Sequence, residues 1–330
     1  MRIYIIILLI LFPLKAWVQD PQFSQFYANP LYMAPSFAGS TDGSRVSLNY
    51  RDQWPSLSGH FVSYSLSADH FFPGFNSGIG LMILKDQAGG GKLNTTNVGL
   101  HYSYKIQINE KINLQPGIQA YYFMRRINFN GLNFADQYVG EQFLGSSVEL
   151  PPEDVINHPD FATSLLAYNE FAWMGFTVDH LMKLNNTLEA DYRYAPLKFS
   201  VYGGSKIILK QRLQTKMNET LTLAFNYRNQ AKQHQLDIGT YYHKFPFVAG
   251  IWYRGLPVFA NIRSHDAITI LLGYKLEDFS FGYSYDMTVG NLITSTGGAH
   301  ELSLIFTFNQ DQKYKKKVKK RYGAIPCPDI

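Results

Sequence analysis

The stretch Thr96–Ile108, with the sequence TNVGLHYSYKIQI, shows the pattern that decides the fold. Every second residue is apolar or aromatic, namely Val98, Leu100, Tyr102, Tyr104, Ile106 and Ile108. The residues between them are small or polar, namely Asn97, Gly99, His101, Ser103, Lys105 and Gln107. A period of two is typical of a β-strand and not of a helix. We therefore predict a strand whose two faces meet different surroundings.

The same alternation recurs from Ser44 to Phe308, for example over 221–228, 279–286 and 301–308. We predict about fourteen strands, most of them close to the length that a tilted strand needs to cross a bilayer. Their expected ranges are 44–51, 60–69, 77–86, 95–108, 111–123, 160–168, 171–181, 197–209, 219–228, 234–243, 246–254, 266–276, 278–287 and 299–309.

The composition and the connections indicate a membrane barrel rather than a soluble β-protein. Aromatic residues make up 15% of the chain and charged residues only 17%, whereas soluble domains carry about 25% charged residues. Very short turns, such as Asn109-Glu110 and Glu277-Asp278, alternate with long connections, above all 125–159. Short periplasmic turns and longer external loops are usual in outer-membrane barrels. We therefore expect an all-β, antiparallel transmembrane outer-membrane β-barrel and not a soluble sandwich or propeller.

The two ends of the chain lie outside this pattern. Residues 1–18 have a basic start and a short apolar core, which predicts a signal peptide and export. We expect an N-terminal periplasmic aromatic and proline-rich segment at 19–43, the barrel at 44–309 and a basic periplasmic tail at 310–330. Seven cations of the tail exceed the net charge of +5 and leave −2 for the rest: Lys313, Lys315, Lys316, Lys317, Lys319, Lys320 and Arg321. Because the protein is exported, anionic lipid or an acidic partner is the expected contact of this tail, and nucleic acid is not.

Motifs for catalysis are weak. Gly89-Gly90-Gly91-Lys92 does not fit a phosphate-binding loop, because Leu93 replaces the required Ser or Thr. His300, Glu301 and Ser303 lie close in sequence, but alternation places His300 and Glu301 on opposite faces of a strand. We expect no enzymatic activity, no cofactor and no metal site. The single cysteine, Cys327, excludes an internal disulfide.

Charged residues within or at the ends of the strands allow two interpretations. They are either ordinary lumen or interface charges, or they adapt the lumen to a translocated chain or solute; these residues are Arg45, Arg51, Lys105, Arg228 and Arg254. The long connection over 125–159 exceeds what closure needs, and such loops commonly fold inward or bind a partner.

The segment Asp20–Gly39 (DPQFSQFYANPLYMAPSFAG) is aromatic, almost uncharged and interrupted by prolines. We expect it to be extended and irregular, because proline removes backbone donors and fixes φ. It packs onto the body of the protein, for example as a plug in the barrel, or onto a partner, and the two can coexist. Aromatic side chains commonly anchor interfaces, so the candidate partner-binding residues are Pro21, Phe23, Gln25, Phe26, Tyr27, Asn29, Pro30, Tyr32, Pro35, Phe37 and Gly39.

These residues also carry a resemblance to a known family. The stretch from Gln19 to Gly39 resembles the N-terminal signature of the PorP/SprF family, and the resemblance continues through Arg45–Pro55. It returns in Gly131–Gln137 and in Asp179-His180-Leu181, and Pro326-Cys327-Pro328 resembles the terminal Cys-Pro of the family. The last three residues, Pro328-Asp329-Ile330, depart from its usual ending.

The resemblance implies an outer-membrane protein of the type IX secretion system of Bacteroidota, linked to gliding and to secretion of surface adhesins. It implies outer-membrane lipid, periplasmic secretion-ring subunits and a secreted adhesin or its C-terminal sorting domain as partners. The expected function is therefore docking or targeting of secreted surface proteins without catalysis. A passive porin or solute channel is the alternative.

Overall fold

The computed structural model describes residues 20–41, 43–90, 92–128, 137–139, 142–143, 155–182, 195–210, 219–231, 233–255, 267–289 and 296–308. The predicted signal peptide, the stretch 131–136 and the basic tail lie outside these residues. Among the described residues no helix has the length and apolar character needed to cross a membrane.

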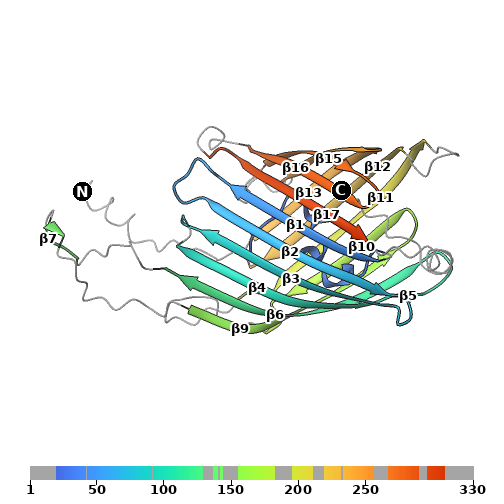
Figure 1. The fold of residues 1–330 in the computed structure, drawn as a ribbon, viewed down its shortest axis with the longest axis horizontal. Coiled ribbons are helices and arrows are strands. Elements are labelled where there is room, and N and C mark those ends of the chain that lie inside the picture. Colours follow the sequence, from blue (N-terminus) through green and yellow to red (C-terminus); the bar gives the residue numbers. More distant parts are fainter. Residues whose placement is uncertain are drawn as a thin grey trace, which may run out of the picture.

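The strands form one closed antiparallel barrel, in which neighbours in sequence are neighbours in the wall (Figure 1). The barrel closes where the first strand, β1, pairs with the last, β17. On the other side of the wall β4 pairs directly with β6. The bounds are β1 Ser44–Gln53, β2 Phe61–Phe72, β3 Ser77–Ala88, β4 Leu93–Tyr104, β5 Ile106–Gln107, β6 Asn113–Ile127, β9 Val155–Tyr168, β10 Ala172–Asp179, β11 Lys198–Lys210, β12 Glu219–Gln230, β13 Gln233–Lys244, β14 Phe247–Arg254, β15 Ala267–Lys275, β16 Phe279–Thr288 and β17 Ala299–Phe308. A separate small hairpin, β7 Tyr138–Val139 with β8 Gln142–Phe143, lies apart from the wall.

The predicted count of fourteen strands is confirmed, because β4 and β5 together form a single strand of the wall that is interrupted at Lys105. The backbone N–H of Lys105 donates instead to the carbonyl of Asn76, 2.8 Å away. Every predicted range overlaps an observed strand. The largest extension is at β9, which begins at Val155 and not at 160.

The alternation seen in the sequence separates the two faces of the wall. In β4, Gly99, His101 and Ser103 are buried on the inside, whereas Leu100 and Tyr102 are 62% and 42% exposed on the outside. An outward band of large apolar side chains is what a lipid-facing barrel wall requires. In β4 the inward face carries small and polar residues, whereas the wall beside the plug also carries buried aromatic side chains such as Trp173 and Trp252.

The two ends of the barrel differ. At one end the connections are tight, for example over 73–76, 169–171 and 245–246, and the start of β1 and the end of β17 lie there. We call it the short-turn end. The opposite end, the loop end, carries the long connections between β6 and β9, β10 and β11, and β14 and β15.

Candidate functional site

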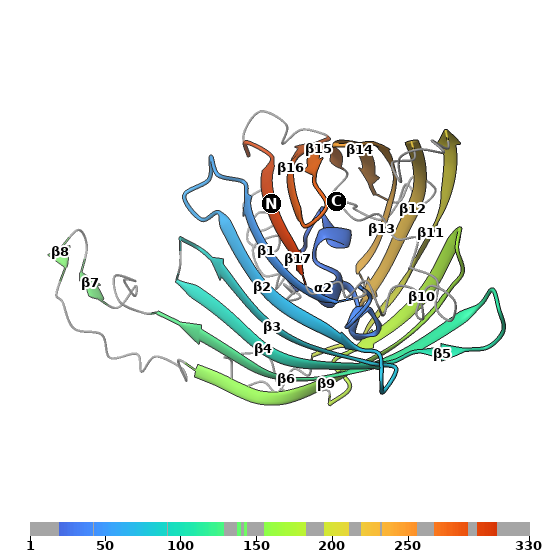
Figure 2. The same cartoon turned by 45° about the vertical axis from the view of Figure 1, so that its right-hand side comes forward.

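The segment Asp20–Gly39, which we call the plug, lies inside the barrel (Figure 2). Phe23, Phe26, Tyr27 and Phe37 are each at most 3% exposed. The expectation of an extended conformation is wrong, because the plug folds into three short turns: η1 Phe26–Ala28, α2 Pro30–Met33 and η2 Pro35–Phe37. The sequence also predicts that the aromatic side chains of this segment are exposed to the periplasm. In this conformation that expectation is wrong, because they pack against apolar side chains of the barrel wall.

Two prolines start turns rather than preventing them. Pro30 and Pro35 are the first residues of α2 and η2, where the missing N–H costs no hydrogen bond and the fixed φ suits a helix. The turns close through Ala34 N–H to the Pro30 carbonyl and Ala38 N–H to the Pro35 carbonyl, both 3.1 Å. The same residue type that predicts irregular structure therefore produces a compact plug.

An aromatic cluster holds the first turn of the plug. The ring of Phe26 lies 4.9 Å from Trp252 of β14 in an edge-to-face arrangement. The ring of Tyr27 lies 5.8 Å from Trp173 of β10 and 6.3 Å from Tyr241 of β13. Edge-to-face pairs add about 0.5–1.5 kcal/mol each beyond the area they bury, so this cluster is a major apolar anchor of the plug.

Glycines of the wall let the plug backbone approach closely. A Cβ at Gly117 of β6 would lie 2.3 Å from the backbone nitrogen of Ser36, and one at Gly78 of β3 would lie 2.1 Å from the carbonyl oxygen of Ala38. No side chain fits at such distances. On this side of the lumen the backbone of the plug therefore packs directly against the backbone of the wall.

A buried charge cluster binds the plug to the first strand, β1, and to the late strands β14, β16 and β17. The Ser24 hydroxyl donates to Asp286 at 2.5 Å and accepts from Arg51 at 2.7 Å and from Arg254 at 2.8 Å. Glu301 accepts the backbone N–H groups of Ser24 and Gln25 at 2.6 and 2.9 Å and also pairs with Arg51 at 3.1 Å. We call these residues the Ser24 hub.

A second polar contact holds the start of the plug. The Nε2 of His180 lies 3.1 Å from Asp20 and its Nδ1 lies 3.0 Å from Asp160, while Lys198 pairs with Asp20 at 2.9 Å. Burial alone would lower the pKa of His180, but the carboxylates of Asp20 and Asp160 outweigh it and raise this pKa to about 10. His180 is therefore a cation between two carboxylates at neutral pH.

The end of the plug is fixed near the short-turn end. The Gly39 N–H donates to Asp69 of β2 at 2.8 Å, and Arg45 of β1 binds both Asp69 and the Phe37 carbonyl. Gly39 has φ +61°, a conformation that favours glycine. The plug thus runs from the loop end, where Asp20 lies, to the short-turn end.

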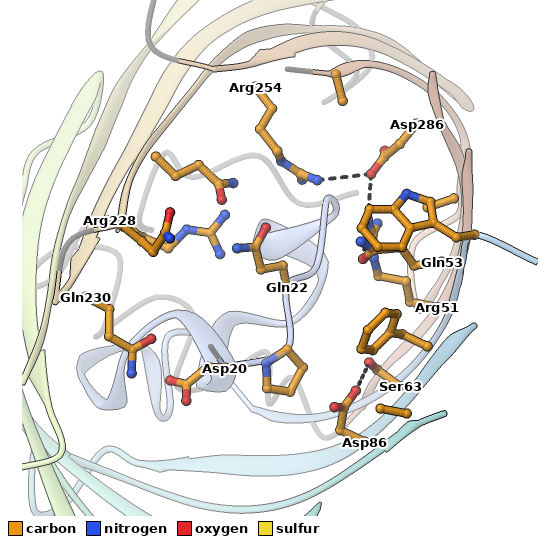
Figure 3. Close-up of a pocket in the computed structure, with 18 of the residues that line it drawn as sticks. Asp20, Gln22, Arg51, Gln53, Ser63, Asp86, Arg228, Gln230, Arg254 and Asp286 are labelled. Carbon is orange, nitrogen blue, oxygen red and sulfur yellow. Dashed lines mark hydrogen bonds and ion pairs between the residues drawn. The ribbon is translucent and has the colours of Figure 1, made fainter. Parts of the chain in front are cut away.

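Beyond the plug, the loop end of the lumen contains a cavity of about 480 Å³, which we call the vestibule. Asp20, Pro21, Gln22 and Tyr32 of the plug are part of its lining, together with residues from the loop-side ends of the strands. Figure 3 shows Gln22 between Arg228, Arg254 and Arg51. A cavity of this size lies within the range of small-molecule sites.

The structure brings most of the residues singled out from the sequence to one place. Phe23, Gln25, Phe26, Tyr27, Asn29, Pro30, Pro35 and Phe37 are buried in the lumen, and Pro21 and Tyr32 border the vestibule. Arg45, Arg51 and Arg254 bind the plug or its hub, and Arg228 pairs with Asp237. Lys105 stacks on Phe71 with its Nζ 3.9 Å from the ring centre.

Sequence reasoning missed the carboxylates that receive the plug. From the sequence alone we give Asp286 no role, consider Glu301 only in a catalytic arrangement that we reject, and do not include Ser24 among the candidate residues. One signal pointed to them: each belongs to a strand whose inward positions are otherwise small or neutral, for example Gly282, Ser284 and Ser303. A buried carboxylate in such a row needs a partner inside the barrel.

Comparisons with known proteins agree with the fold. The model of the family described as "Type IX secretion system membrane protein PorP/SprF" matches residues 16–306. Among solved structures, the Ralstonia pickettii toluene transporter TbuX is similar, with 10% identity, a TM-score of 0.50, and coverage of 85% of this chain and 93% of that chain. The Acinetobacter baumannii outer membrane protein Omp33 shows 9% identity, a TM-score of 0.43, and coverage of 82% and 100%. No curated protein was found to match.

The family match covers most of the chain, which therefore belongs to the PorP/SprF family of type IX secretion system membrane proteins. It is a non-enzymatic family, and the chain forms a 14-stranded outer-membrane barrel. Of the stretches that carry the resemblance, 20–39 contacts both 45–55 and 179–181 in the described part of the structure. The family resemblance of this chain therefore concentrates at the interface between plug and wall.

Proposed function

We propose that this barrel is a docking component for secreted surface proteins and that its clients do not pass through its own lumen. The observation that supports this is the plug, which is bonded to the wall at the Ser24 hub, at Asp20 and at Gly39. A passive porin needs a continuous aqueous path, whereas here buried aromatic residues from β10, β13 and β14 close around the plug. The channel alternative therefore requires the plug to move.

The partners in this proposal are the periplasmic secretion-ring subunits on the short-turn side and an adhesin-type client, or its C-terminal sorting domain, at the barrel rim. The candidate residues of the plug act here as a fixed scaffold. Phe23, Phe26 and Phe37 can reach a partner only if the plug leaves the lumen, because the wall covers them.

The basic tail is proposed to contact anionic lipid or an acidic surface of the periplasmic machinery. It follows β17, whose last residue Phe308 pairs with Ser44 at the short-turn end. The cations proposed for this contact are Lys315, Lys316, Lys317, Lys319, Lys320 and Arg321. Their attraction to anionic lipid should fall as ionic strength rises.

The test uses a disulfide that fixes the plug. The backbone N–H of Ser36 donates to the Ser164 hydroxyl of β9 at 2.8 Å, so the two residues are in direct contact. We combine Ser36→Cys with Ser164→Cys and establish that the bridge has formed by the loss of free thiols before the assay. Cys327→Ser removes the single native cysteine. A strain lacking this gene is complemented with wild type, with the locked variant, or with Cys327→Ser alone as the matched control.

Docking without passage predicts that client secretion is lost in the deletion strain and restored equally by all three forms, oxidised or reduced. Normal secretion in the deletion strain would show that the docking proposal is wrong. Secretion restored only after reduction of the locked variant would show that the plug must move, which favours the channel alternative. Recovery of ring subunits with the purified locked variant tests the periplasmic contact separately.

A further inference from the structure

The vestibule is a cavity of about 480 Å³ whose inner side is formed by the plug, so a ligand can occupy it without any movement of the plug. Its lining comes from the plug and from the loop-side ends of most strands, from Arg51 of β1 to Ala299 of β17. The family assignment gives this cavity no role, and the docking proposal above does not depend on it. Its chemistry can be read from which of its polar groups are already bonded.

Four of the five lysines and arginines that line the vestibule form ion pairs within the protein, and the fifth, Arg125, donates to the Thr95 hydroxyl at 3.1 Å. Three arginines meet three carboxylates: Arg51 pairs with Asp286 and Glu301, Arg254 with Asp237 and Asp286, and Arg228 with Asp237. Lys198 is held by Asp20 and Asp179 at 2.9 and 3.4 Å. A cavity whose cations are already paired offers little to a free anion, because the anion would have to displace a buried carboxylate.

The side-chain amides of glutamines in the vestibule lining are available to form hydrogen bonds with a ligand. Gln22, Gln230 and Gln233 line the cavity, and within the described part of the chain their side-chain amides make no hydrogen bond. Each amide offers two donors and one acceptor in a single plane. Gln53 accepts from Arg51 only at 3.4 Å, which leaves its NH₂ group without a described partner. Vicinal hydroxyl groups, which also donate and accept, complement such a set.

Aromatic rings stand beside these amides. Trp54 and Phe61 both line the cavity, with ring centres 5.8 Å apart. Trp54 has φ +61°, which is rare for a bulky residue. Its backbone N–H donates to the Gly298 carbonyl at 2.7 Å. Backbone strain of this kind is concentrated at functional sites. A flat ring that is only half-buried can stack on the C–H face of a sugar.

We infer that the vestibule is a binding site for a neutral saccharide, held by Gln22, Gln230 and Gln233 and by stacking on Trp54 and Phe61. The plug closes the inner side, so the site accepts the end or a branch of a glycan and not a chain in transit. The mixed lining suits a saccharide, because unbonded amides lie in the same cavity as the rings of Trp54 and Phe61, and a peptide is the competing ligand that the experiment tests. Because external loops lie at this end in outer-membrane barrels, the site faces the cell surface, where glycans occur.

The experiment measures retention of purified full-length protein, in detergent, on an array of neutral and charged glycans. Hits are then titrated in solution by following the fluorescence of the protein. We expect neutral oligosaccharides to bind, and Gln230→Leu to weaken binding about three- to tenfold, the worth of one hydrogen bond. Gln107→Leu is the matched control, since Gln107 is exposed at the short-turn end, and it should bind like wild type.

Folding is checked for every variant by the heat-dependent gel shift of the barrel. If Gln230→Leu does not fold, Gln22→Leu replaces it, because Gln22 belongs to the plug and not to a strand. The inference is overturned if no neutral glycan is retained, if only charged glycans or peptides bind, or if every folded vestibule variant binds as wild type does. None of these outcomes bears on client secretion, so failure here is separable from failure of the docking proposal.

Discussion

Gly117→Ala should loosen the plug while leaving the barrel intact. Gly117 lies in β6 between neighbours that pair regularly with β4 and β9, so alanine suits the strand itself. The added methyl group would meet Ser36 N at 2.3 Å and the Pro35 carbonyl carbon at 2.6 Å. These are backbone atoms of the plug and cannot rotate away.

The cost follows from that geometry. Ordinary contact needs about 3.5 Å, so the plug backbone has to retreat by about 1 Å from the wall. Overpacking of this kind costs about 1–3 kcal/mol. Applied to the equilibrium between seated and released plug, this energy raises the released fraction about 5- to 150-fold.

Planar-bilayer recording measures the released fraction, because release of the plug removes the aromatic side chains that fill the lumen between β10, β13 and β14. Wild type should give rare openings, and Gly117→Ala should raise the open fraction by the factor above. Gly74→Ala is the control, since nothing lies within 4 Å of a Cβ at that position. Equal open fractions in wild type and Gly117→Ala, with both barrels folded, would refute the conclusion that wall and plug match at this contact.

Other contacts of the plug give further expectations, each measured by protease cleavage of the plug in folded barrels. Glu301→Gln removes a buried charge that binds Arg51 and two backbone N–H groups, and it should destabilise the seated state by about 3–5 kcal/mol; cleavage at the wild-type rate would contradict this. Phe26→Ala should cost about 3–5 kcal/mol through the cavity left beside Trp252, whereas Phe75→Ala, at a 76% exposed side chain, should cost almost nothing. The pKa of His180 is raised from 6.5 to about 10, so its stabilisation is complete below about pH 6.5 and is lost as the pH rises through about 10. Protection of the plug should fall over that range in wild type but not in His180→Gln, and a flat wild-type profile would contradict the assignment.

The barrel could be predicted from sequence because its wall repeats one local rule. Inward and outward residues alternate along the strands, so each strand can be predicted from its own residues without knowledge of the others. Even the break at Lys105 changes no neighbour, since β4 and β5 both pair with β6. The boundary differs most at β9, where residues 155–159 are predicted as part of the long connection but belong to the strand.

The plug could not be predicted in the same way, because its structure depends on partners far away in sequence. Pro30 and Pro35 indicate irregular backbone when only neighbours are considered, yet both start turns once the lumen surrounds them. The partners of Ser24 are more than 200 residues distant, apart from Arg51. Patterns of neighbouring residues cannot predict such pairings. The family resemblance does include two of the stretches that form them, 19–39 and 45–55.

The Ser24 hub has a consequence for the order of assembly. Ser24 is made before any strand, but the carboxylates that receive it, Asp286 and Glu301, lie on β16 and β17, the last strands of the chain. The plug can therefore reach its final position only when the wall is complete, and contacts between distant parts of a chain form slowly. Seating of the plug and joining of β1 to β17 are then a single late step. A barrel that closes without its N-terminal segment would leave Glu301 without the two backbone N–H donors of Ser24 and Gln25 and Asp286 without the Ser24 hydroxyl, so only the correctly assembled chain satisfies these buried carboxylates.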